Sequence, residues 1–128
     1  MTGRDLVLAA LKGQATPRVP WVPFTGVHIG NLKGVDAEEL LKSAELLVAC
    51  GVEANQRYQP DGQPVIFDLQ VEAEILGCDL QWAKDAPPAV AAHPLANGYE
   101  GLKELPMPQP ENGRLPIILE AMRGLKEK

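Results

Sequence analysis

Acidic side chains gather in one short block of the sequence. Asp68 closes the apolar run "PVIFD" and is followed by Glu72 and Glu74. A carboxylate at the mouth of a sheet could stabilise a cationic group through charge-assisted hydrogen bonds. The same aspartate could instead cap the helix predicted over residues 69–77, because aspartate accepts hydrogen bonds from the first amides of a helix. The two roles are not exclusive, and both stay open.

The remaining reactive side chains show no arrangement typical of a catalytic or metal site. Glu72, Glu74 and Asp79 are expected on a solvated face, and no metal site is predicted. Cys50 and Cys78 lack CxxC spacing and lie beside glycines, which indicates buried thiols without a disulfide. The phosphate-loop, dinucleotide-binding, serine-hydrolase and HExxH patterns are all missing from the sequence.

Composition limits the class of protein. The 128 residues are 45% hydrophobic, enough for one globular domain spanning residues 1–128. Twelve basic against 17 acidic residues give a net charge of −5, which disfavours nucleic-acid binding. No apolar run approaches the roughly 18 residues of a membrane span, and the N-terminus does not resemble a signal peptide. We therefore expect a cytoplasmic protein without membrane or nucleic-acid partners.

The elements that must position Asp68 alternate between two periodicities. Helical spacing predicts helices over residues 3–12 and 36–51, the second capped by Asp36 and stopped by Gly51. Between them "TPRVPWVPF" is strand-like but broken by prolines, and it leads into a glycine-rich loop over 25–34.

The second half predicts short strands and one further strong helix. Strand-like runs are "VEANQRY", "PVIFD" and "CDLQW", followed by a long surface connection over 83–112 with a helical turn near "GYEGLKEL". The stripe from Leu115 to Leu125 predicts a final amphipathic helix that little of this chain can cover.

This order of strands and helices predicts an α/β fold with parallel strands and crossover helices. Two to four strands do not close a barrel, so we interpret the chain as the first part of a larger α/β protein. Open strand edges and an uncovered helical stripe also predict self-association, for example as a homodimer.

Several motifs resemble a known family. They are "ALKG", "PRVPWVPF", "FDLQVEAEILGC", "PPAV", "HPL" and "GRLPIILEAMRGLKE", which together extend over nearly the whole chain. In this order they resemble the N-terminal part of the uroporphyrinogen decarboxylase superfamily, which includes cobalamin-dependent methyltransferases acting on coenzyme M and similar thiols. The motifs "VEAEILGC" and "GRLPIILEAM" favour the methyltransferase branch. The resemblance implies an incomplete (β/α)8 TIM barrel, whose full form is well over twice this length.

Three functions follow from the resemblance. The first is corrinoid-dependent methyl transfer to a thiol by the full-length protein, with zinc held by His and Cys ligands in the later half of the barrel. This chain alone would then be inactive and without cofactor. The second is uroporphyrinogen decarboxylation in tetrapyrrole synthesis, with a tetrapyrrole substrate in place of the corrinoid. The third is a free-standing binding module that dimerises through its open barrel edge.

The resemblance also implies a catalytic residue. The decarboxylase carries its catalytic aspartate in an F-S-D motif, which places Asp68 in that role, although extra residues around "QPDGQP" leave Asp61 as an alternative. An acid at the C-terminal end of a barrel strand lies where such barrels do their chemistry.

Substrate-binding residues are expected at the same rim. They are Phe24, Gly26, His28 and Phe67. The decarboxylase's R-Q-A-G-R motif corresponds to "PFTGV" at residues 23–27, where Gly26 is kept and neutral side chains replace both arginines. A substrate with many carboxylates needs cationic partners, so this difference disfavours the decarboxylase reaction.

Overall fold

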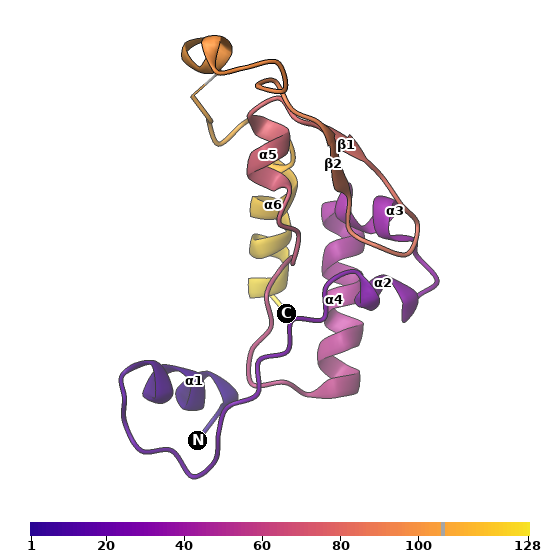
Figure 1. The fold of residues 1–128 in the computed structure, drawn as a ribbon. Helices are drawn as coiled ribbons and strands as arrows, with labels where there is room; N and C mark the ends of the chain where they lie inside the picture. The colour runs from indigo at the N-terminus through magenta and orange to yellow at the C-terminus, as the bar shows by residue number, and fades with distance from the viewer. Residues whose placement is uncertain (106) are drawn as a thin grey trace.

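A computed structural model describes residues 1–105 and 107–128 (Figure 1). The described part is mainly helical, with one small sheet. Its elements in chain order are α1 (Gly3–Leu11), α2 (His28–Asn31), α3 (Ala37–Leu41), α4 (Ala44–Tyr58), α5 (Val71–Ile75), β1 (Asp79–Gln81), β2 (Ala89–Ala92), the 3-10 helix η1 (Glu100–Glu104) and α6 (Leu115–Lys126). In Figure 1, α1 lies at one end of the molecule and the η1 segment projects at the other.

Helices α4 and α6 lie side by side and form the centre of the fold (Figure 1). Glycines allow their close approach: a Cβ on Gly124 would lie 2.8 Å from Val48 Cγ2, and one on Gly51 would lie 3.2 Å from Leu125 Cδ2. The buried cluster consists of Ile29, Leu40, Leu47, Cys50, Ala54 and Ala121. The last helix thus finds a partner in α4, although Leu119 and Met122 on its stripe stay exposed.

The predicted helix over 36–51 is two helices. The capping box at its start is confirmed, because Asp36 accepts a hydrogen bond of 2.9 Å from the Glu39 amide. The first helix ends at Leu41, and Ser43 begins a second by accepting from the Leu46 amide at 3.2 Å.

Helix α4 continues past Gly51 to Tyr58, so the predicted stop at Gly51 and the predicted strand "VEANQRY" are both wrong. Glycine is tolerated there because the side chain of Leu125 fills the space that a Cβ would need. The helix ends instead at Gln59, whose φ of +48° is left-handed.

The expected parallel strands do not form among the described residues. The sheet there is an antiparallel pair in which β1 meets β2, with Leu80 opposite Val90. The predicted strand "CDLQW" is thereby confirmed in part, whereas β2 lies in a stretch expected to be loop. The helical turn near "GYEGLKEL" is confirmed as η1.

The segments "VPWVPF" and "PVIFD" form neither strands nor helices, and Val65 in the second lies in a bend. A backbone hydrogen bond of 2.9 Å runs from the amide of Asp61, just before the second segment, to the carbonyl of Trp21 in the first. A strand needs a ladder of such bonds, and two prolines in the first segment, Pro20 and Pro23, remove donors. The predicted glycine-rich loop also contains a helical turn, α2.

No helix within residues 1–105 and 107–128 combines the length and the hydropathy that crossing a bilayer requires.

Candidate functional site

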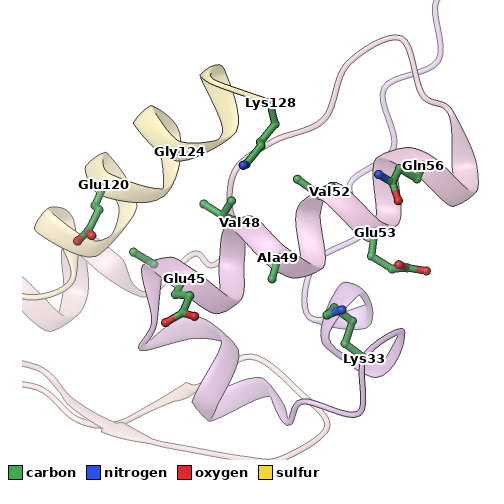
Figure 2. Close-up of a pocket in the computed structure, with 11 residues that line it drawn as sticks. Lys33, Glu45, Val48, Ala49, Val52, Glu53, Gln56, Glu120, Gly124 and Lys128 are labelled. Atoms are coloured by element: carbon green, nitrogen blue, oxygen red, sulfur yellow. The ribbon is translucent and has the colours of Figure 1, made fainter.

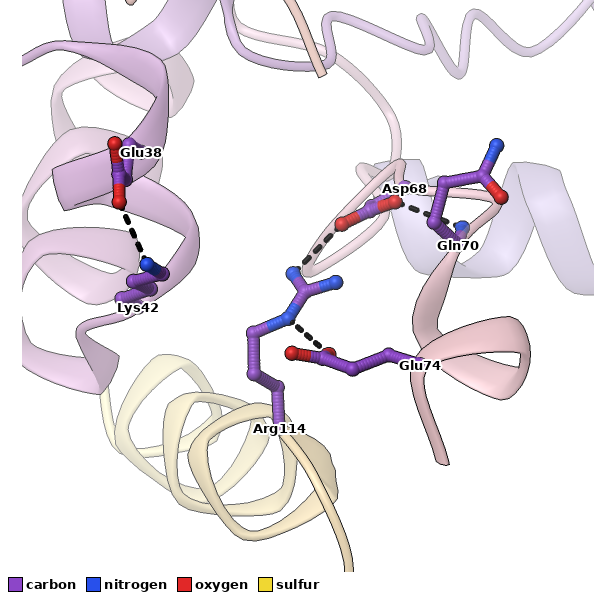
Figure 3. Close-up of polar contacts among 6 residues, drawn as sticks. All are labelled: Glu38, Lys42, Asp68, Gln70, Glu74 and Arg114. Carbon is purple, nitrogen blue, oxygen red and sulfur yellow. Dashed lines mark hydrogen bonds and ion pairs between the residues drawn. The ribbon is translucent and has the colours of Figure 1, made fainter. Parts of the chain in front are cut away.

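Arg114 joins the acidic block to the start of α6 (Figure 3). Its Nη1 lies 2.6 Å from Asp68 Oδ2, and its Nε donates to Glu74 Oε2 at 2.7 Å. The side chains of Arg114 and Asp68 are 5% and 0% exposed, whereas Glu74 is 26% exposed. We call these three residues the arginine clamp.

The geometry of the clamp is uneven. The Nε–Glu74 contact is a directed hydrogen bond, but Nη1 and Asp68 Oδ2 are close without the angles of a hydrogen bond, so that contact is an ion pair only. Arg114 Nη2 is buried and has no hydrogen-bond partner among the described residues. The Arg114 Cζ lies 4.9 Å from the Trp82 ring centroid, and Lys42 Nζ lies 4.1 Å from the same centroid, so cation–π attraction adds to the clamp.

Asp68 has both carboxylate oxygens engaged inside the chain. Oδ2 faces Arg114, and Oδ1 accepts a hydrogen bond of 2.8 Å from the Gln70 amide, two residues on. The N-cap of α5 is Gln70, so the interpretation of Asp68 as the N-cap residue is wrong. Its catalytic role stays a prediction, and in this conformation the carboxylate does not reach the surface.

Phe24, Gly26 and Phe67 come together at the surface beside the clamp. The two phenylalanine rings lie 5.1 Å apart between centroids at 50°, and they are 67% and 41% exposed. Gly26 has a left-handed φ of +56°, and a Cβ there would lie 4.0 Å from Phe67. We call Phe24 and Phe67 the aromatic pair. Exposed aromatic rings are suited to bind an apolar ligand.

His28 forms its side-chain hydrogen bond with Tyr58, not with the aromatic pair. Its Nε2 is 2.8 Å from the Tyr58 hydroxyl at the end of α4, and the direction of that hydrogen bond depends on the histidine tautomer. The imidazole is held by a neighbouring side chain and is exposed to solvent. Its substrate-binding role stays a prediction.

Asp61 is held in the N-terminal part of the fold. Arg18 binds both of its oxygens, with Nη2 to Oδ1 at 2.7 Å, and the Trp21 amide donates to Oδ2 at 2.8 Å. The hydrogen bonds from Arg18, followed by that from the Trp21 amide, lower the pKa of Asp61 to about 2. The Asp61 side chain is only 6% exposed, so in this conformation it contacts Arg18 rather than a ligand.

The described residues do not provide a metal site. Among residues 1–105 and 107–128, no three His, Cys, Asp or Glu side chains come close enough to hold a metal ion. Cys50 and Cys78 are free thiols, and burial raises the pKa of Cys50. A zinc site therefore does not fit the residues that the structure describes.

The larger cavities lie away from the clamp. One of about 530 Å³ lies between α4 and α6, with Val48, Val52 and Gly124 at its floor and charged side chains around it (Figure 2). Another of about 590 Å³ lies between the same helices and residues 63–65. A cavity of about 120 Å³ is closer to the predicted site, since it is lined by Phe67, Leu69, Gln70, Pro87 and Pro88. Of these three cavities, the small one is lined by a predicted site residue, Phe67.

Sequence reasoning missed Arg114, although one signal was present. Arg114 is the N-cap of α6, where the helix dipole disfavours a cation. A cation in that place indicates that carboxylates from elsewhere compensate it. Their identity could not be read from the sequence, because Glu74 is 40 residues away.

Comparison with known proteins identifies the family. The model of the family "Uroporphyrinogen decarboxylase (URO-D)" matches residues 2–128, so the chain belongs to this family. This confirms the resemblance seen in the sequence, and the family implies a TIM-barrel fold.

The similar proteins are methyltransferases of methanogens. Methylcobamide:CoM methyltransferase MtbA of Methanosarcina acetivorans is 30% identical over 99% of this chain and 38% of its own length. Methylated-thiol–coenzyme M methyltransferase of Methanosarcina mazei is 33% identical over 62% of this chain and 19% of its own. A solved structure of a methyltransferase from Methanosarcina mazei has a TM-score of 0.84 and 27% identity, covering 99% of this chain and 39% of that one. The chain thus spans less than half the length of these relatives.

Proposed function

We propose that this chain is the N-terminal part of a (β/α)8 barrel that transfers a methyl group from a corrinoid to a thiol. The observation that carries the proposal is the match of methyltransferase relatives, in sequence and in structure, along almost the entire chain. The 128 residues alone are then inactive, because the remaining strands and their side chains complete the site.

The aromatic pair supports a ligand-binding rim. Phe24 ends the segment "VPWVPF", and Phe67 is the last residue but one of "PVIFD". The family resemblance implies that these two segments correspond to the first two barrel strands. Active sites of TIM barrels lie at the C-terminal ends of their strands. A bound corrinoid would supply the methyl–cobalt bond, and the two exposed rings suit the apolar edge of such a macrocycle. Zinc, which the family resemblance also implies, would have to be held by residues outside the described part.

The role of Asp68 in this proposal is indirect. A fully buried carboxylate paired with a guanidinium cannot contact substrate unless that pair opens. Breaking a buried ion pair costs about 3–5 kcal/mol, more than a loop rearrangement readily supplies. We therefore propose that the aromatic pair contacts the ligand and that Asp68, buried beneath it, holds Phe67 in position without touching the ligand.

Decarboxylation of a polycarboxylate tetrapyrrole fits the rim less well. Pro23 and Val27 are neutral where the decarboxylase resemblance places arginines, and Arg114 is already committed to two carboxylates. Self-association is a further proposal, since Phe24 and the α6 residue Met122 leave apolar surface exposed. Size-exclusion chromatography tests it, and a monomer at all concentrations would contradict it.

The activity is tested with methylcobalamin, coenzyme M and zinc. The 128-residue chain and the longest protein that its gene encodes are assayed in parallel, following the methyl–cobalt absorbance. We expect loss of that absorbance with the longer protein only. A longer protein that leaves methylcobalamin intact would remove the proposed function, and turnover by the short chain would contradict its inactivity.

A further inference from the structure

We propose that Arg114 is a positioning residue that acts through Asp68 on the aromatic pair. The proposal rests on the proposed function, in which Phe24 and Phe67 contact the ligand. It assigns a role to Arg114, a charged residue that is 4% exposed.

Side chains alternate in direction around Asp68. Asp68 points inward and is fully buried, whereas Phe67 and Leu69 on either side point outward and are exposed. Leu69 and Gln70 lie in a turn, so a fixed direction for the Asp68 side chain also constrains the backbone of its neighbour Phe67. The bond from the Gln70 amide to Asp68 Oδ1 then closes the turn after Phe67. Holding Asp68 therefore holds Phe67 against Phe24.

Arg114 is itself immobilised, as a positioning residue must be. It is anchored at the start of α6, donates to Glu74 and lies over the Trp82 ring. Glu74 and Trp82 lie in segments that are separate in sequence from α6, so the guanidinium cannot move without disturbing both contacts. Figure 3 shows the contact with Glu74. Precise positioning of a binding side chain depends on such supporting contacts.

Carbodiimide labelling of carboxylates, read by mass spectrometry, tests the first step on the chain itself. We expect Asp68 to be protected in the wild type and, in Arg114→Met, to be labelled as readily as exposed Glu72. Glu74→Gln is the matched control: it removes the other carboxylate of the clamp and should leave Asp68 protected. Asp61 is the internal control for folding, since it is buried by Arg18 and remote from the clamp in its contacts.

Arg114→Lys covers the case in which the methionine variant unfolds. Lysine keeps a cation but cannot form the guanidinium fork, so we expect Asp68 labelling between that of the wild type and of Arg114→Met, with Asp61 protected. Labelling of Asp61 together with Asp68 in both variants would make Arg114 a general scaffold residue and overturn the proposal. Continued protection of Asp68 in both variants would overturn it as well.

The second step is read from methylcobalamin binding by the longest protein that the gene encodes. We expect Arg114→Met and Phe67→Ala each to raise the Kd roughly tenfold, because a displaced contact weakens binding, while kcat at saturation changes little. An unchanged Kd in Arg114→Met, beside a raised Kd in Phe67→Ala, would overturn the positioning role alone. No binding by the wild type would remove the proposed function, and the labelling of Asp68 would still decide whether Arg114 positions this segment.

Discussion

Replacing Arg114 by methionine is expected to lower the free energy of unfolding by about 3–5 kcal/mol, the typical cost of leaving a buried charge without its partner. The reason is the environment of Asp68, whose side chain is 0% exposed and would be left without its cationic partner. Methionine fills a similar length without adding a charge. The free energy of unfolding of small domains is about 5–15 kcal/mol, so this single substitution removes a large fraction of it.

The other members of the clamp set the comparison. Glu74→Gln should cost about 1 kcal/mol or less, because that carboxylate is 26% exposed and water can replace part of its interaction. Asp68→Asn keeps an oxygen for the Gln70 amide and removes the charge. The double variant Arg114→Met/Asp68→Asn should therefore recover most of the stability lost in Arg114→Met, with a coupling energy of about 2–3 kcal/mol.

Urea unfolding followed by circular dichroism at 222 nm measures all four variants, with equal slopes against urea as the check on comparable unfolding. Two results would refute the reasoning. One is a loss below about 1 kcal/mol in Arg114→Met, which would mean that water or another group compensates Asp68. The other is a double variant as unstable as the sum of the two single variants.

Three further predictions concern other parts of the chain. The pKa of Asp61 is lowered from 3.8 to about 2, so its ion pair should stabilise the fold fully above pH 3.8 and progressively less down to pH 2; Asp61→Asn should flatten acid unfolding in that window, and an unchanged profile would contradict the pairing. Gly124→Ala should stabilise α6 by about 1 kcal/mol through helix propensity but destabilise the fold by about 1–3 kcal/mol, because the new Cβ crowds Val48. Thermal unfolding should therefore show a lower stability, which a second substitution, Val48→Ala, restores. Because burial raises the pKa of Cys50, a thiol reagent at pH 8 should modify Cys78 first and Cys50 only on unfolding, whereas two equally fast thiols would refute this assignment.

The sequence predicted best what depends on local chemistry. The capping box of Asp36 and Glu39, the helical turn at η1 and the final helix were all visible in neighbouring residues. The family was visible too, because its motifs are contiguous. Such features need no knowledge of which distant segments meet.

The errors concern features that depend on distant partners. "VEANQRY" continues a helix because Gly51 fits under Leu125, a contact that local propensity does not encode. "PVIFD" lacks the ladder of a strand because its hydrogen-bonding neighbours are not supplied by the described residues. The clamp joins residues 40 positions apart in the case of Glu74 and Arg114, so only the misplaced cation at the start of α6 pointed to it.

The clamp also closes a loop: the Glu74–Arg114 contact joins the two ends of the stretch from residue 74 to residue 114. A second contact holds this stretch against α3, because the Ala37 amide donates a hydrogen bond of 2.7 Å to the Lys84 carbonyl. The outer portion, residues 89–105, contributes no buried side chain. Its length and composition can therefore diverge between relatives, or be swapped by grafting, while α4 and α6 keep their register.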